Sequence, residues 1–94
     1  MLTISKRAQA GTLESNDIMI ALSPDSSGIH IELESKVLFQ YGDRIREVIE
    51  TTLRRQGVEA VSVLADDHGA LDCTIEARTL TALERSGWTI REDV

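Results

Sequence analysis

The sequence has little of several residue types that support chemistry or special structure. Its 94 residues include 1 Cys, 1 Pro and 3% aromatic residues. A single cysteine excludes an internal disulfide and a cysteine-rich zinc site. The longest uninterrupted apolar run covers residues 18–22, far short of the roughly 20 residues that span a bilayer. No apolar stretch follows Lys6 and Arg7, so the opening residues lack the pattern of a secretory signal.

Positive charge is also scarce. The chain has 10 Lys and Arg against 16 Asp and Glu, which gives a formal net charge of −6. A protein that binds nucleic acid needs clustered cations to neutralise phosphates, so this balance argues against such a partner. We therefore expect a cytoplasmic protein with neither a nucleic-acid nor a membrane partner. Its sparse chemical groups also argue against a typical stand-alone enzyme.

The rest of the composition is that of a folded domain. The chain is 41% hydrophobic and 28% charged, as in ordinary globular proteins and unlike disordered ones. Its length suits one domain, and it contains no linker, fixed-period repeat or low-complexity block. We expect a single domain over residues 1–94, with a core of about residues 8–86 and tails at 1–7 and 88–94.

Alternating apolar residues predict strands on both sides of a turn. Residues 18–22 and 29–33 each place an isoleucine or leucine at every second position, which is typical of half-buried strands. The turn between them contains Pro24 and Gly28, which favour chain reversal, so we expect these two strands to pair as a hairpin. Residues 8–13 form a weaker strand candidate, and residues 58–64 another strand.

Two segments have helical periodicity. The first has an apolar stripe with spacings of three and four residues: Leu38, Tyr41, Ile45, Val48, Ile49 and Leu53. The second, residues 70–86, has a stripe of Cys73, Ala77, Leu80 and Leu83; a strand that begins at Ala70 and breaks near Thr79 is the alternative. The expected order is β-β-β-α-β-α. It predicts an α+β fold, a two-layer domain with a small, mostly antiparallel sheet and both helices on one face.

The residues that most often perform chemistry have ordinary structural interpretations here. His30 and His68 lack further His or Cys neighbours to complete a metal site, so we predict two surface residues and no metal. Asp66 and Asp67 are adjacent in a predicted turn, where carboxylates rarely converge. Cys73 lies on a predicted apolar helix face, which favours a buried small side chain over a nucleophile. We expect no catalytic residue.

Ser15 is the one unusual feature. It lies in a predicted exposed bend between Glu14 and Asp17, and no neighbouring residue is placed to act as a base. This setting favours a covalent modification site over a nucleophile. Taken alone, these residues leave a plain turn serine as the more common interpretation.

Three sequence blocks resemble a known family. They cover residues 10–17 (AGTLESND), 41–46 (YGDRIR) and 66–73 (DDHGALDC). In this order and spacing they resemble the acyl carrier (gamma) subunit of bacterial citrate lyase, with similarity from about Ala8 to Arg85. The familiar helical acyl carrier proteins differ, because their Asp-Ser-Leu motif and all-helical pattern are absent here.

The resemblance implies a function for Ser15. In that family the serine of the Leu-Glu-Ser-x-Asp motif carries phosphoribosyl-dephospho-CoA through a phosphodiester, added by a prosthetic-group transferase. The chain would be a non-catalytic carrier in a complex that splits citrate into acetate and oxaloacetate. An alpha subunit would exchange the acetyl group on the arm's thiol for a citryl group. A beta subunit would then cleave the citryl thioester.

Two alternatives remain open at this stage. The carrier subunit of malonate decarboxylase resembles this family in size and prosthetic group. An acidic interaction module without any prosthetic group would leave Ser15 as an ordinary turn residue.

Overall fold

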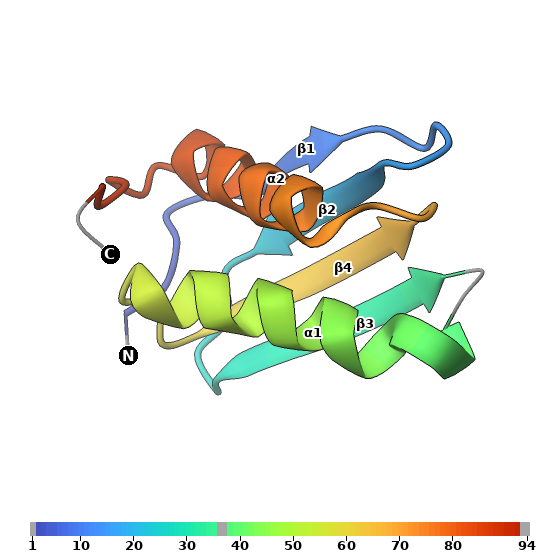
Figure 1. Cartoon of the computed structure of the whole chain (residues 1–94). Helices are drawn as coiled ribbons and strands as arrows, with labels where there is room; N and C mark the ends of the chain where they lie inside the picture. Colours follow the sequence, from blue (N-terminus) through green and yellow to red (C-terminus); the bar gives the residue numbers. More distant parts are fainter. Residues whose placement is uncertain (1, 36–37, 93–94) are drawn as a thin grey trace.

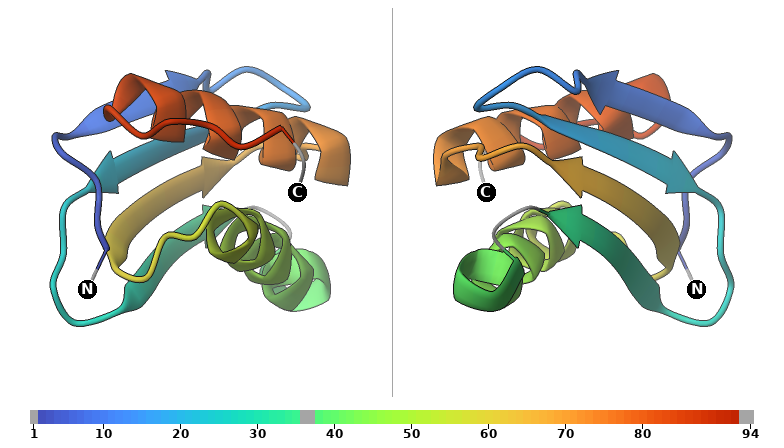
Figure 2. Two further views of the ribbon diagram at one scale, coloured as in Figure 1. Left: turned by 90° about the vertical axis from the view of Figure 1, so that its left-hand side faces the viewer. Right: turned by 90° about the vertical axis from the view of Figure 1, so that its right-hand side faces the viewer.

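Six secondary-structure elements follow one another in the predicted order. The computed structural model describes residues 2–35 and 38–92. The elements are β1 (Ala8–Gly11), β2 (Ile18–Ser23), β3 (Ile29–Ser35), α1 (Leu38–Arg55), β4 (Val61–Asp67) and α2 (Asp72–Arg85). Both helices lie on the same side of one sheet (Figures 1 and 2). The two-layer α+β fold is therefore confirmed. Neither described helix has the length and apolar character needed to cross a membrane.

The strand pairing differs from the expected hairpin. The sheet has the order β1-β2-β4-β3, so β4 lies between β2 and β3. The β1–β2 and β2–β4 pairs are antiparallel, whereas β3 and β4 are parallel. The sheet is mixed, and the prediction that β2 pairs with β3 is wrong. Alternation reports which face of a strand is buried, not its neighbour, and α1 returns the chain so that β4 can run parallel to β3.

The core lies between the sheet and the two helices. Its fully buried centre consists of alternating β2 and β4 side chains under the inner faces of the helices. The largest of these side chains are Ile18, Ile20, Leu22, Ile49, Leu53, Ile75, Val61, Val63 and Leu83. The α1 stripe is as predicted at Ile45, Val48, Ile49 and Leu53. Tyr41 is instead exposed, and the side chain of Leu38 lies outside the described residues.

Helix α2 turns a different face to the core than its apolar stripe suggested. Cys73 and Ala77 are exposed, whereas Ile75, Thr79, Ala82 and Leu83 are buried. Thr79 tolerates burial because its hydroxyl donates a 2.8 Å hydrogen bond to the Ile75 carbonyl within the helix. The helix was predicted correctly, but the burial of Cys73 was wrong.

The core extends past residues 8–86 at both ends. Ile4 is only 3% exposed and belongs to the core cluster, and Trp88 packs against it. The Leu2 carbonyl accepts hydrogen bonds from the backbone of Glu59 and Ala60. These contacts integrate parts of both expected tails into the domain.

Candidate functional site

Ser15 lies at the exposed tip of a tight turn between β1 and β2. This Ser15 turn (residues 14–17) is closed by a 3.2 Å hydrogen bond from the Asp17 amide to the Glu14 carbonyl. Asn16 has φ 66°, a conformation that asparagine tolerates better than most residues. A positive φ at the third turn position is typical of a type II turn. Within the described part of the chain, the Ser15 side chain has no hydrogen bond or ion pair, and the residue is exposed.

Asp17 anchors this turn to the body of the protein. Its carboxylate accepts hydrogen bonds from the Thr12 hydroxyl at 2.7 Å and from the Ile18 amide at 2.7 Å. Arg78, on α2, donates from Nε at 3.0 Å and from a terminal nitrogen at 2.8 Å, a bidentate pair with defined geometry. The Arg78 guanidinium and the Thr12 hydroxyl hold the pKa of the Asp17 carboxyl well below its usual range.

The Ser15 turn is also joined to the loop that leads into α2. The Asn16 amide donates to the His68 carbonyl at 2.8 Å, and the His68 amide donates to the Asp17 carbonyl at 2.9 Å. These bonds continue the register in which Ile18 pairs with Asp67. The Ser15 turn and the 68–71 loop therefore form one connected unit.

Asp66 and Asp67 do not lie in the predicted turn, because they are the last two residues of β4. Asp67 is 1% exposed, and its carboxylate accepts hydrogen bonds from the Ser35 hydroxyl at 2.9 Å and from the amides of Gly69 and Ala70 at 3.2 and 3.0 Å. Three donors satisfy this buried charge and fix the course of the 68–71 loop.

Each histidine lies beside a polar side chain. His30 is exposed, as predicted, and its Nε2 lies 2.9 Å from the Ser27 hydroxyl. His68 is half-buried, with its Nε2 3.1 Å from an Asp66 oxygen, so the prediction of a plain surface residue is wrong for His68. The described residues include no group of three or more His, Cys, Asp or Glu side chains placed to hold a metal.

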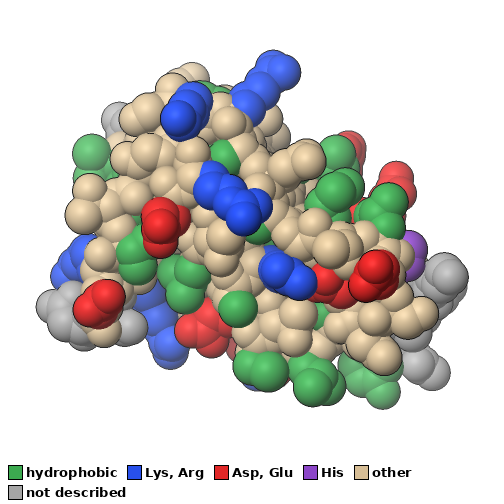
Figure 3. All heavy atoms as spheres, turned by 90° about the horizontal axis from the view of Figure 1, so that it is seen from above, with side chains coloured by type: hydrophobic (Ala, Val, Ile, Leu, Met, Phe, Trp, Pro, Cys, Tyr) green, Lys and Arg blue, Asp and Glu red, His purple; other side chains and the backbone are tan. Residues whose placement is uncertain are grey.

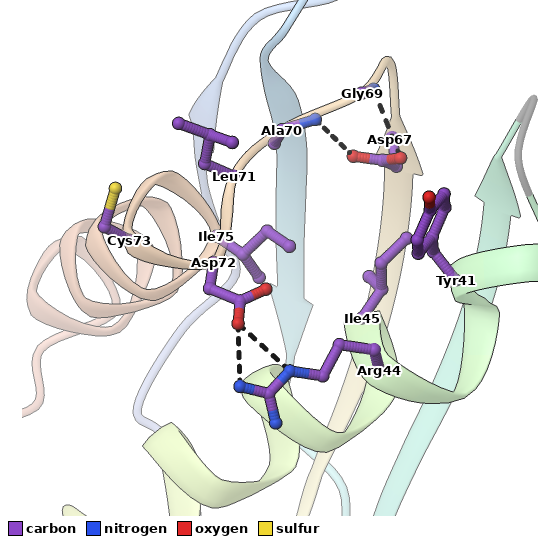
Figure 4. A pocket seen from close by; sticks show the side chains of 10 residues that line it. All are labelled: Tyr41, Arg44, Ile45, Asp67, Gly69, Ala70, Leu71, Asp72, Cys73 and Ile75. Atoms are coloured by element: carbon purple, nitrogen blue, oxygen red, sulfur yellow. Dashed lines mark hydrogen bonds and ion pairs between the residues drawn. The ribbon is translucent and has the colours of Figure 1, made fainter.

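An open pocket lies on the other side of the 68–71 loop. It has a volume of about 640 Å³ and is bounded by α1, this loop and the first turn of α2 (Figure 4). Ile45, Ala70 and Ile75 contribute apolar wall. Arg44 and Asp72 form an ion pair between the two helices, with nitrogen–oxygen distances of 3.0 and 2.7 Å.

Exposed apolar side chains occur at the same end of the molecule. Leu13, two positions before Ser15, is 54% exposed, and Leu71 is 70% exposed. In the view from above, hydrophobic and acidic side chains gather at the right-hand end, where the β1–β2 connection lies in Figure 1 (Figure 3). The site thus combines an accessible hydroxyl, a fixed turn and an apolar surround.

The comparisons with known proteins identify the family. Residues 5–86 match the family model described as malonate decarboxylase delta subunit (MdcD). The citrate lyase acyl carrier protein of Lacticaseibacillus casei is 55% identical over 85 residues, covering 90% of this chain and 84% of the relative. That of Halothermothrix orenii is 48% identical, covering 90% of each chain. The chain belongs to the citrate lyase acyl carrier protein family.

The fold of this family member also occurs in a solved complex. A chain in the crystal structure of a Pseudomonas malonate decarboxylase hetero-tetramer in complex with malonate superimposes with a TM-score of 0.77. The alignment covers 90% of this chain and 88% of that one, at 23% sequence identity. At this identity the likeness establishes a shared fold.

The sequence alone did not indicate every residue of the candidate site in this chain. The family motif includes Asp17, but nothing in the sequence points to Arg78, 61 positions away. Ser35 and the pocket were missed for the same reason, since both depend on contacts between distant segments.

Proposed function

We propose that this chain is the acyl carrier subunit of citrate lyase and that Ser15 holds its covalent prosthetic group. The observation that carries the assignment of Ser15 is its exposed hydroxyl, without described partners, on a turn that is fixed from several sides. A transferase needs access to the hydroxyl, and a swinging arm needs a defined starting point; this geometry meets both needs.

The residues around Ser15 fit a phosphoribosyl-dephospho-CoA group joined through a phosphodiester. Leu13, Glu14 and Asn16 are exposed like Ser15, so these neighbours leave space for a bulky substituent on the Ser15 hydroxyl. A covalent phosphodiester does not require a preformed cationic site for its phosphate. The negative charge of Glu14 beside Ser15 is therefore compatible with this attachment. When attached, the group supplies a terminal thiol that carries acyl groups as thioesters.

The protein's own contribution is presentation. The Asp17–Arg78 pair and the backbone bonds to His68 hold the base of the arm in place. Tethering keeps the acyl group near each partner site at an effective concentration on the order of millimolar. The partners would be an alpha subunit for acyl exchange, a beta subunit for citryl cleavage and the transferase that loads Ser15. The sparse side-chain chemistry fits a carrier with no catalytic residue.

The carrier of malonate decarboxylase is the second candidate, favoured by the description of the matching family model. The relatives at 48–55% identity, however, are named citrate lyase acyl carrier proteins. We therefore regard citrate as the substrate of the complex.

Reconstitution tests this function. The loaded chain, mixed with citrate lyase alpha and beta subunits, should restore the cleavage of citrate to acetate and oxaloacetate, and the Ser15→Ala chain should not. The Ser26→Ala chain, altered at another exposed loop serine, is the matched control and should act like wild type. Activity only with malonate decarboxylase subunits and malonate would favour the second candidate.

A further inference from the structure

The 68–71 loop connects the Ser15 turn with the pocket. Asn16, next to Ser15, bonds to the His68 carbonyl at 2.8 Å, and its side-chain oxygen lies 3.6 Å from the position that a Cβ on Gly69 would take. Gly69 and Ala70 in turn line the pocket. A group attached to Ser15 therefore starts beside the loop that forms one wall of the pocket.

The pocket exposes apolar surface that the core does not use. Tyr41 and Leu71 line it, yet they are 56% and 70% exposed. Figure 4 places Leu71 and Tyr41 on opposite sides of the pocket, with Ile45 and Ile75 between them. An accessible concave site with apolar walls is typical of small-molecule binding.

The charges around the pocket select the kind of ligand. Among the described residues that line it, Arg44 is the one cation, and its guanidinium is already bonded to Asp72 and to Glu47. Asp67, at the pocket floor, is satisfied by three donors of its own. The part of the lining that the structure describes thus offers no free cation for a phosphate and suits an uncharged chain with amide and thiol groups.

We propose that this pocket is the resting site of the terminal, thiol-bearing portion of the arm on Ser15. The inference rests on the proposed function. The phosphate-bearing base of the arm stays in solvent near Ser15, while the uncharged end lies against Tyr41, Ala70 and Leu71. Docking there removes the acyl thioester from bulk water between visits to partner sites.

Disulfide trapping tests this placement, because Cys73 is a free, exposed thiol on the pocket lining. In a glutathione redox buffer, the arm thiol first exchanges with oxidised glutathione. The Cys73 thiolate then attacks the arm sulfur and releases reduced glutathione. One oxidised glutathione thus becomes two reduced ones, as Cys73 and the arm thiol lose two hydrogens. The fraction of closed disulfide gives the effective concentration of one thiol near the other.

The matched control moves the cysteine to the other face of the sheet. In the Cys73→Ser, Glu34→Cys chain the thiol lies near the same end of the sheet, at an exposed position opposite the helices. We expect an effective concentration at least about fivefold higher for Cys73 than for this control, because the tether alone gives both the same order of magnitude. Leu71→Ser, at a highly exposed position, should lower the effective concentration of the arm thiol near Cys73. It should leave the effective concentration near the control cysteine unchanged.

The outcomes separate this inference from the proposed function. A chain that gains no mass from the loading enzymes contradicts the proposed function before trapping begins. For a loaded chain, two results overturn the pocket placement alone. One is an effective concentration at Cys73 less than about fivefold above that of the control. The other is an effective concentration at Cys73 that Leu71→Ser does not change.

Discussion

At the scale of single residues, the site depends on how the neighbours of Ser15 are held rather than on Ser15 itself. Ser15 has no described side-chain partner, whereas Asp17 gathers donors from Thr12, Ile18 and Arg78. These donors come from β2, α2 and the connection before the turn. One buried carboxylate thus ties the Ser15 turn to the sheet and a helix.

The Asp17 carboxylate should make stability depend on pH. Its pKa is lowered in the folded chain by Arg78 and Thr12, so its stabilisation is present above the ordinary pKa of about 3.9 and is lost as pH falls toward the folded pKa. Asp17→Asn should lower the unfolding free energy at pH 7 by about 1–3 kcal/mol. It should also reduce the loss of stability between about pH 5 and pH 2. Urea unfolding across this range measures both effects.

Asp43→Asn is the control for this experiment, because Asp43 is fully exposed on α1. Asp43→Asn should leave the unfolding free energy within about 0.5 kcal/mol of the wild-type value at each pH. An Asp17→Asn profile parallel to that of wild type would show that Asp17 does not anchor the turn.

The sequence was informative about Ser15 and uninformative about Arg78. Turn-forming neighbours predict an exposed position locally. Contact between residues 17 and 78 requires the packing of α2 on β1 and β2, which no local pattern encodes. Cys73 was misplaced because α2 has apolar residues on two faces, and the hydroxyl of Thr79 bonds within the helix and permits burial of the other face.

At the scale of elements, strand positions follow from sequence but strand partners do not. Alternation located β2 and β3 closely, yet β4 separates them. The β3–α1–β4 segment is a crossover unit, and the burial of α1 against β3 makes the parallel pairing favourable. Residues 58–60, expected to begin a strand, precede β4, which instead extends to Asp67.

Gly11 enables the close pairing of β1 with β2. Its φ is +97°, and a Cβ there would lie 1.8 Å from the Ile18 carbonyl oxygen. Gly11→Ala should therefore add a backbone clash to conformational strain and lower the unfolding free energy by about 3 kcal/mol or more. Thermal or urea unfolding measures the loss.

Gly28→Ala separates strain from clash, because Gly28 has φ +123° but its Cβ would meet only a His30 nitrogen at 4.0 Å. This variant should lose about 1–2 kcal/mol. Equal losses in the two variants would contradict the role assigned to close β1–β2 contact.

At the scale of the whole molecule, one sheet face carries both helices, and the β1–β2 connection lies at the same end as the loop from β4 to α2 (Figure 1). That loop lines the pocket. The opposite end is held by the terminal segments. Leu2 binds the backbone before β4, and Ile4 enters the core. Sequence reasoning missed these contacts because residues 1–7 have no periodicity that marks one face as buried.

Ile4→Ala tests whether the first segment is part of the domain. Ile4 is 3% exposed, so its truncation should leave a cavity and cost about 2–5 kcal/mol. Leu2→Ala is the matched control, since Leu2 is 60% exposed and should change stability by less than about 0.5 kcal/mol. Urea unfolding measures both variants. Similar small decreases in the unfolding free energy for both would show that residues 1–7 form a tail and do not contribute to the core.

The central claim concerns the hydroxyl of Ser15, and intact-mass spectrometry after co-expression with the loading enzymes tests it most directly. Wild type and Ser26→Ala should gain the mass of one phosphoribosyl-dephospho-CoA group. Ser15→Ala should remain unmodified while keeping wild-type stability within about 0.5 kcal/mol. A wild-type chain that stays unmodified with active loading enzymes, or a Ser15→Ala chain that still gains the group, would contradict the account.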